Sequence, residues 1–169
     1  MSLSPEEFDI RYSELEDLDF LQRWFNDPKE REPFPFEKDF ETLGSLKNWI
    51  GFAKFQASLT GMVGGVPCAI GTLFLMPYRK VAHRASFYLY VEPKQRKKGV
   101  GISMLRNLVH LAKTRFRLES IHAEFYEPNI PFRSLLEKQS FHVLVEQEHF
   151  FKLNGNYLPR VVMEHSIPK

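Results

Sequence analysis

The chain has 169 residues, of which 43% are hydrophobic and 26% charged, a composition typical of soluble globular proteins. This balance excludes a mainly disordered chain. No apolar run reaches the roughly 18–20 residues of a membrane-spanning helix, so we expect no membrane partner. A single cysteine, Cys68, excludes a disulfide framework and a cysteine-based zinc site, and we expect it to be a buried small hydrophobic residue. Because Met1 is followed by no basic and apolar leader, we expect a cytoplasmic protein.

The length is typical of one domain, which we place over residues 1–169. Charge is unevenly distributed along it. Residues 1–45 hold 13 acidic and 5 basic residues, whereas residues 94–117 hold eight lysines or arginines and no acidic residue. We expect the basic stretch to attract phosphate and the acidic part to attract a cation or an amine. Two solvated helix faces are the alternative interpretation of the same pattern.

Hydrophobic periodicity predicts strands and helices that alternate along the chain. Residues 8–12 alternate between apolar and polar side chains and predict a short strand. Apolar side chains at helical spacing from Leu15 to Asn26 predict a helix, for which Ser13 is the expected N-cap. The proline-rich residues 28–37 predict a loop. The remaining predicted elements are helices over 39–54, 99–115 and 131–138 and strands over 56–63, 68–76, 85–91, 120–125, 141–151 and 160–166. This order predicts a mixed α/β fold, with helices covering the faces of a sheet.

The connection between the strand 85–91 and the helix 99–115 has the features of a phosphate-binding turn. Gly99 and Gly101 lie at the expected start of the helix. There the first backbone N–H groups have no partner within the helix and, together with the helix dipole, they form an anion site. Residues 96–98 are Arg-Lys-Lys and add positive charge. Although a solvated basic turn is the alternative, we predict a diphosphate site, and the spacing matches neither a Walker A loop nor a dinucleotide fingerprint.

The stretch Arg-Lys-Lys-Gly-Val-Gly at residues 96–101 resembles motif A of the GNAT superfamily of acyl-CoA N-acyltransferases. Asn129 and the stretch 133–141 are similar to the asparagine and the short helix that follow in that family. The opening strand and helix, with Trp-Phe-Asn-Asp-Pro at 24–28, resemble the Rim-type branch, which includes N-terminal acetyltransferases of ribosomal proteins. The resemblance implies a mostly antiparallel sheet of six to seven strands with a central splay and helices on both faces. It also implies an acyl-CoA-binding core over residues 85–141 and a variable, acceptor-side part over residues 5–56.

The resemblance further implies that acetyl-CoA is the co-substrate. We expect no metal, because the six histidines show no metal-ligand spacing. The diphosphate would lie on the turn, the pantetheine arm would pair with the strand 85–91 like an added strand, and the N–H near Val91 would polarise the thioester carbonyl. The residues expected to bind acetyl-CoA on this basis are Leu89, Tyr90, Val91, Arg96, Lys97, Lys98, Gly99, Val100, Gly101, Ile102, Asn129 and Arg133.

Transfer of an acyl group to an amine needs a base, because an amine at neutral pH is mostly protonated. Glu92 ends the strand 85–91, and His122 and Glu124 alternate on the next strand. We rank Glu92 and Glu124 about level and His122 third. Leu136 stands where many relatives have a tyrosine that protonates the leaving thiolate, so the acid is open. The acid candidates are Tyr88, Tyr90, Tyr126 and Ser134.

The predicted function is transfer of an acetyl group from acetyl-CoA to a primary amine by direct attack on the thioester. The acceptor is either a protein or peptide N-terminus or a small amine such as a polyamine, and the protein is a monomer or a homodimer. One alternative is a CoA-binding regulatory or scaffold protein with little catalysis, for which Leu136 is the best support. A nucleic-acid-binding module is another, but the basic stretch lacks interleaved aromatic residues, so we expect no nucleic-acid partner. Phenylalanines of the variable part are expected either in the core or on an acceptor pocket: Phe34, Phe36, Phe40, Phe52 and Phe55.

Overall fold

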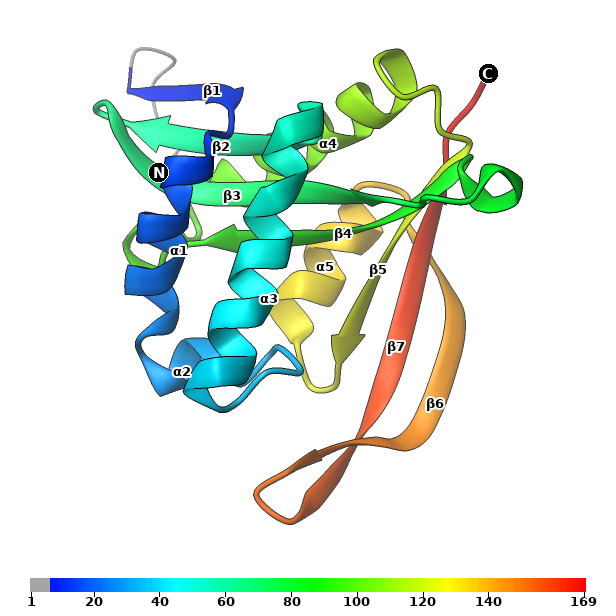
Figure 1. The fold of residues 1–169 in the computed structure, drawn as a ribbon. Helices are drawn as coiled ribbons and strands as arrows, with labels where there is room; N and C mark the ends of the chain where they lie inside the picture. Colours follow the sequence, from blue (N-terminus) through cyan, green and yellow to red (C-terminus); the bar gives the residue numbers. More distant parts are fainter. Residues whose placement is uncertain (1–6) are drawn as a thin grey trace.

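The computed structural model describes residues 7–169, and it contains one seven-stranded sheet (Figure 1). The strands are β1 (Phe8–Tyr12), β2 (Ser58–Val63), β3 (Val66–Leu75), β4 (Arg84–Val91), β5 (Ser120–Tyr126), β6 (His142–Leu153) and β7 (Asn156–Ser166). Their order across the sheet is β1-β2-β3-β4-β5-β7-β6. Every neighbouring pair is antiparallel except β4 and β5, which are parallel. The predicted mixed, mostly antiparallel sheet is confirmed.

Helices cover both faces of this sheet. They are α1 (Leu18–Phe25), α2 (Pro28–Arg31), α3 (Asp39–Gly51), α4 (Val100–Thr114) and α5 (Ile130–Lys138). In Figure 1, α1 and α3 lie in front of β2, β3 and β4, whereas α4 and α5 lie behind. Among residues 7–169, no helix is both long and apolar enough to cross a membrane.

Two hydrophobic cores hold the helices against the sheet. The core behind the sheet includes the α4 stripe Leu105, Leu108 and Ala112, which are all fully buried, as their helical spacing predicts. At Gly71 of β3, an added Cβ would come within 2.7 Å of Leu108 Cδ1, so the missing side chain lets α4 approach the strand closely. The core in front is mainly aromatic, with Phe25 in contact with Trp49 and other rings under α1 and α3.

Two local predictions are wrong. The segment 28–37 is not entirely a loop, because Pro28–Arg31 forms one turn of helix whose first free N–H, that of Lys29, bonds to Asp27 Oδ1 at 3.0 Å. Ser13 is not an N-cap either. Its hydroxyl is buried at 2.8 Å from Thr60 Oγ1 on β2. The N-cap of the following turn is instead Glu14, whose N–H donates to the Asp17 carboxylate at 3.0 Å. Contacts across the sheet therefore outweighed the local capping preference of the serine.

The last two strands are longer than the periodicity predicts and form a continuous hairpin. Asn154 and Gly155 make its two-residue turn, with φ of 49° and 81°. Positive φ at both central positions is the geometry that a tight turn needs to match the twist of two long strands. The residues between the two predicted strands therefore continue the ladder, with Leu153 opposite Asn156 and Lys152 opposite Tyr157.

The parallel pair at the centre of the sheet separates after three residue pairs. β4 and β5 are in register only from Arg84 opposite Ser120 to Ser86 opposite His122. Beyond these positions the two strands diverge, while β4 stays paired with β3 as far as Val91. The edge of β4 from residue 87 to residue 91 is consequently not covered by β5. This is the central splay that the family resemblance implies.

Candidate active site

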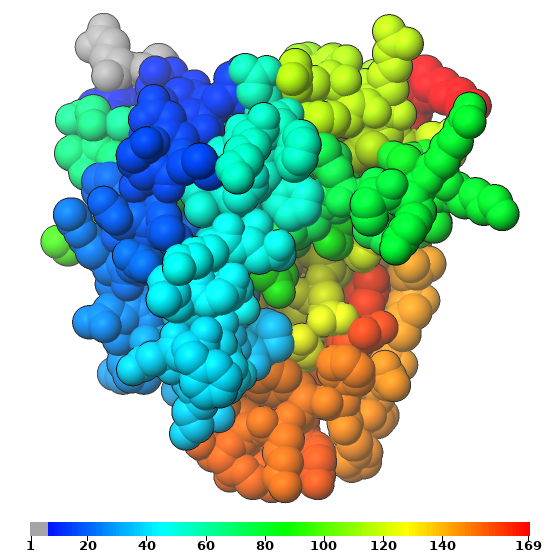
Figure 2. Space-filling view, in the orientation of Figure 1, coloured from blue at the N-terminus to red at the C-terminus, as the bar shows by residue number. Residues whose placement is uncertain are grey.

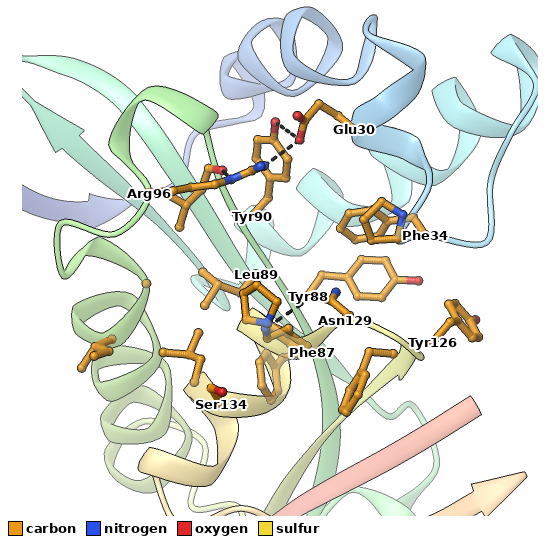
Figure 3. Close-up of a pocket in the computed structure, with 18 of the residues that line it drawn as sticks. Glu30, Phe34, Phe87, Tyr88, Leu89, Tyr90, Arg96, Tyr126, Asn129 and Ser134 are labelled. Atoms are coloured by element: carbon orange, nitrogen blue, oxygen red, sulfur yellow. Dashed lines mark hydrogen bonds and ion pairs between the residues drawn. The ribbon is translucent and has the colours of Figure 1, made fainter. Parts of the chain in front are cut away.

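A cavity of about 700 Å³ lies where β4 and β5 diverge. Its wall combines residues 87–91 of β4, residues 124–126 of β5 and part of α5 with the turn at 96–102 and with the segment 29–35 that contains α2 (Figure 3). The cavity is therefore built from parts of the chain that are far apart in sequence. On the face drawn in Figure 2, the surface is hollowed between helix α3 in cyan and the red and orange strands β7 and β6.

One end of the cavity is the start of α4. Gly99 precedes the helix with φ of 88°, a left-handed conformation that glycine adopts without strain. The helical hydrogen bonds begin with the Ser103 N–H, which donates to the Gly99 carbonyl at 3.1 Å. The N–H groups of residues 100–102 precede that bond, so the helix itself does not use them. Of these residues Gly101 and Ile102 line the cavity, whereas the side chain of Val100 is buried in the core. The arrangement offers backbone donors and the positive end of a helix dipole to an anion.

The basic residues of this turn differ in how their charges are used. Within residues 7–169, no carboxylate lies within ion-pair distance of Lys97 or Lys98. Lys97 lines the cavity and Lys98 does not. Arg96 also lines the cavity, but its guanidinium donates to Glu30 Oε2 at 2.6 Å. The charge of Arg96 is therefore neutralised within the protein, and the two lysines remain free to face an anion.

The opposite end of the cavity is aromatic and carries one carboxylate, that of Glu124. Its two oxygens have separate partners, because Arg160 Nη1 lies 2.9 Å from Oε1 and the Tyr126 hydroxyl donates to Oε2 at 2.9 Å. Tyr88 extends toward the same end, where its ring meets the edge of Phe34 at a centroid distance of 5.4 Å (Figure 3). A group that enters here meets rings on several sides and a carboxylate whose charge is balanced by Arg160.

Burial and neighbouring carboxylates together raise the pKa values of the tyrosines of the site. Burial is the main cause that raises the pKa of Tyr88, and the charge of Glu124 adds to it. The pKa of Tyr126 is also raised, first by burial and then by its hydrogen bond to Glu124. Tyr90 has a raised pKa through burial and through its hydroxyl bond to Glu30. All three phenols therefore keep their protons at neutral pH and are able to donate hydrogen bonds.

The three sequence-ranked candidates for the base lie in different surroundings. Glu124 is on the cavity wall, whereas Glu92 and His122 are not among the lining residues. Glu92 lies beyond the end of β4, where its N–H donates to the Cys68 carbonyl at 2.8 Å. His122 lies two residues before Glu124 on β5 and therefore on the same face of the strand. Burial and the positive charge of Arg84 lower the pKa of its imidazole. The fold thus brings Glu124 to the cavity and leaves the other two outside its wall.

Helix α5 supplies the last side of the cavity. Asn129 caps this helix, with its Oδ1 accepting the Phe132 N–H at 3.4 Å, and it also lines the cavity. Ser134 lines it as well, whereas Leu136 is fully buried in the core and does not. Arg133, predicted to bind the donor, lies outside the lining and pairs with Glu127 and other carboxylates.

Of the five phenylalanines that the sequence offers as candidates for an acceptor pocket, only Phe34 lines the cavity. Phe36 is buried in the aromatic core and Phe52 packs on Phe74, whereas Phe40 and Phe55 are mostly exposed. Cys68 is buried as expected, and burial raises the pKa of its thiol to about 12. Within residues 7–169, no cluster of three or more histidine, cysteine, aspartate or glutamate side chains is suited to a metal ion.

Comparison with known protein families identifies the chain. The acetyltransferase (GNAT) domain family matches residues 8–142, which is most of its length. The chain belongs to the GNAT acetyltransferase family. As a member it is an acetyl-CoA-dependent N-acetyltransferase, and both the fold class and the enzyme class expected from the sequence are confirmed. The family implies an acetyl acceptor and does not identify it. No curated protein was found with significant similarity to the sequence.

Solved structures agree with this acetyltransferase in fold at low sequence identity. YncA from Salmonella typhimurium, solved with its cofactor acetyl-CoA, is 16% identical with a TM-score of 0.84, and the match covers 96% of this chain and 95% of YncA. An N-acetyltransferase from Staphylococcus aureus Mu50 is 18% identical with a TM-score of 0.83, covering 95% and 99%. A ribosomal-protein-alanine N-acetyltransferase from Brucella melitensis is 20% identical with a TM-score of 0.79, covering 94% and 99%. The Rim-type branch is thus one of several distant structural neighbours, and it does not stand apart from the others.

Sequence reasoning missed several residues of this acetyltransferase that line the cavity. Glu30 and Lys29 belong to the segment predicted as a plain loop, and nothing in their local pattern indicates a contact with the turn at 96–102. The motif draws attention to Leu136 and not to its neighbour Leu135, although of these two leucines only Leu135 lines the cavity. A helical phase assignment for α5 would have distinguished these two leucines, whereas the contact of Glu30 has no local signal.

Proposed function

We propose that this acetyltransferase moves the acetyl group of acetyl-CoA to a primary amine, which is either a protein or peptide N-terminus or a small amine. The proposal is supported above all by the uncovered edge of β4. That edge leads from the start of α4 to the aromatic end of the cavity, next to Glu124. One ligand can therefore place a diphosphate at one end and an acyl group at the other.

For the donor, we assign the diphosphate to the N–H groups of residues 100–102 with Lys97 and Lys98 beside them. The pantetheine arm, an amide chain, would pair with the free edge of β4 as an added strand, which is a recurring way to bind extended ligands. The amide nitrogen of Asn129 remains available to the arm, because only its oxygen caps α5. The sequence favoured the Val91 N–H as donor to the thioester carbonyl, but Val91 lies at the α4 end of the edge, where its carbonyl accepts the Arg96 Nε–H. We therefore propose the Leu89 N–H, which also faces away from β3 and lies nearer to Glu124, as that donor. Losing one such donor typically reduces transition-state stabilisation by about 2.7–4 kcal/mol.

For the acceptor, we propose that the amine enters over Phe34, Tyr88 and Tyr126. Glu124 removes a proton from the amine, directly or through water, and the nitrogen then attacks the thioester carbon. The tetrahedral intermediate collapses by breaking the C–S bond, the nitrogen loses its remaining extra proton to become a neutral amide, and the thiolate takes up a proton. Tyr88 and Ser134 are the proposed donors of that proton, because the hydroxyls of Tyr90 and Tyr126 already donate to carboxylates. The acidic residues of the first 45 positions are consistent with a cationic acceptor.

Thiol release from acetyl-CoA tests the proposal directly. The assay would use spermidine, simple alkylamines and short peptides with different first residues, with products identified by mass spectrometry. Glu124→Gln removes the proposed base while keeping a similar side-chain volume. A general base typically contributes about 10²–10⁴-fold, so we expect kcat/KM to fall by that factor for any accepted amine.

Glu92→Gln serves as the matched comparison, because it neutralises a carboxylate that does not line the cavity. Equal losses from the two substitutions would contradict the assignment of Glu124. If the wild-type protein binds CoA and yet releases no thiol with any acceptor, the alternative of a CoA-binding regulatory or scaffold protein would replace the proposed function. The buried Leu136 in place of a tyrosine is the observation that favours this alternative.

A further inference from the structure

The segment 27–38, which we call the strap, joins α1 to α3 and forms one wall of the cavity. Hydrogen bonds hold both ends of the strap in place. Asp27 caps α2. Arg31 donates from Nε to the Phe25 carbonyl at 2.6 Å and from Nη1 to the Glu37 carbonyl at 3.0 Å. Between these ties, the strap contributes Phe34 to the acceptor end of the cavity. The position of the strap therefore sets the shape of the acceptor end.

Glu30 connects the middle of the strap to the turn before α4 (Figure 3). Its Oε2 accepts the Tyr90 hydroxyl at 3.0 Å and the Arg96 Nη2 at 2.6 Å. The side chain of Glu30 is 15% exposed and that of Arg96 is 46% exposed, so this ion pair is partly shielded from solvent. Charged hydrogen bonds in such surroundings are stronger than those on an open surface.

Arg96 is held by further contacts on the protein side. Its Nε donates to the Val91 carbonyl at 2.9 Å, and its guanidinium carbon lies 5.4 Å from the centre of the Tyr90 ring. Tyr90 is itself buried and stacks on Trp24 of α1 at a centroid distance of 5.4 Å. The guanidinium thus fits a site made of β4 and the strap. A planar fork of donors suits this role better than a lysine would.

The charges around the turn also indicate that Arg96 pairs with Glu30 rather than with a phosphate group. A bare carboxylate beside the turn would repel the diphosphate that the turn is proposed to bind. The guanidinium cancels that charge, and Lys97 and Lys98 carry the excess positive charge of the turn. A phosphate group that drew Arg96 away would leave Glu30 shielded from solvent and without its cation, which is costly.

We propose that Arg96 is a positioning residue for the acceptor rather than a ligand of the diphosphate. Through Glu30 it fixes the strap, and the strap fixes the acceptor wall of the cavity. This inference rests on the proposed function, because it takes the turn at 96–102 as the donor site. It predicts that loss of the Glu30–Arg96 pair weakens acceptor binding and leaves CoA binding intact.

CoA binding, measured by calorimetry, separates the two roles of Arg96 without any need for activity. The decisive variant is the double replacement Glu30→Gln with Arg96→Gln, because it removes both charges of the pair and leaves no bare carboxylate beside the turn. In the positioning role, this double variant binds CoA as tightly as the wild type. In the phosphate role, it binds CoA more weakly, because a cation that holds the diphosphate is lost. Lys97→Gln is the matched comparison on the same turn and is expected to weaken CoA binding. Weaker CoA binding by the double variant would overturn the proposal.

Amide hydrogen exchange tests the strap itself. Residues 27–38 should exchange faster in Arg96→Gln, in Arg96→Lys and in Glu30→Gln than in the wild type. Arg96→Lys keeps the charge and loses the fork, so it also replaces Arg96→Gln should that variant not fold. Unchanged exchange in the strap would overturn the proposal.

Steady-state kinetics complete the test with spermidine and with an alanine-leading peptide as acceptors. Two donors are compared, acetyl-CoA and S-acetyl-pantetheine, and the latter lacks the diphosphate. We expect Arg96→Gln and Glu30→Gln to raise the acceptor KM at least about fivefold with either donor, a size typical of coupling between sites. The double variant should be no worse than the more affected single variant, because both remove the same contact. An additive double variant, or an effect seen only with acetyl-CoA, would refute the positioning role. If no acceptor reacts even with the wild type, the proposed function fails, whereas the binding and exchange results still decide the role of Arg96.

Discussion

Replacement of Gly99 by alanine tests the physical basis of the donor site most directly. Gly99 has φ of 88° and ψ of 0°, and a Cβ added there would meet no atom within 4 Å. The substitution therefore introduces no clash, and its cost is that of a left-handed conformation for an L-residue, about 1–2 kcal/mol. We expect the free energy of unfolding to fall by that amount. For a chain of this length, each kcal/mol corresponds to a Tm decrease of about 2–4 °C.

The same substitution should weaken CoA binding. Relief of the strain rotates the peptide planes that begin α4 and misdirects the N–H groups of residues 100–102. The loss of one hydrogen bond to a charged group is about 1.5–3 kcal/mol, so we expect CoA affinity to fall at least about tenfold. Gly44→Ala is the control, since Gly44 is exposed within α3, has no positive φ and has open space around its added Cβ. That variant should gain about 0.5–1 kcal/mol in stability and bind CoA normally.

Urea unfolding followed by circular dichroism gives the stability of each variant, and calorimetry gives its CoA affinity. If Gly99→Ala were as stable as the wild type, the left-handed conformation would not be needed at this position. If it were destabilised and yet bound CoA with wild-type affinity, the donor would not use the backbone of this turn. Either result would refute the reasoning from helix geometry to diphosphate binding.

Three further predictions concern stability and reactivity. His122 has a pKa lowered by burial and by Arg84, so the unfolded chain binds a proton more readily than the folded one and stability should fall as the pH decreases through about 6.5. The unfolding free energy of His122→Gln, measured from about pH 8 down to about pH 5, should lack this component, and parallel curves for both proteins would contradict it. Gly71→Ala should lose about 1–3 kcal/mol, because the new methyl group meets Leu108, and Leu108→Val should restore part of that loss if the clash is its cause. Cys68 should react with Ellman's reagent only as fast as the protein unfolds, since burial raises its pKa to about 12, and fast reaction of the folded protein would show that the thiol is accessible.

Features that depend on neighbouring residues in the sequence were predictable. The apolar stripe that buries Leu105 and Leu108 follows helical spacing, and the paired glycines mark the start of α4 at the end of a strand. The element order and the resemblance to GNAT enzymes rest on such local patterns. They predicted the mixed α/β sheet with its central splay, and they predicted the turn at 96–102 as the anion site. The fold class and enzyme class are confirmed, whereas the individual site residues stay predictions.

What only the tertiary structure decided is which distant side chains meet. From the sequence, Glu92 and Glu124 are about equally good candidates for the catalytic base, because Glu92 follows the end of one predicted strand and Glu124 lies within the next. The pairing of β5 with β7 turns Glu124 toward the cavity and Arg160, whereas Glu92 lies past the end of β4. In the same way, the bond between Glu30 and Arg96 joins residues 66 positions apart. Local spacing determines helices, strands and turns because it acts through backbone geometry over a few residues. Long-range pairs depend on how the whole sheet packs, and no short pattern records that.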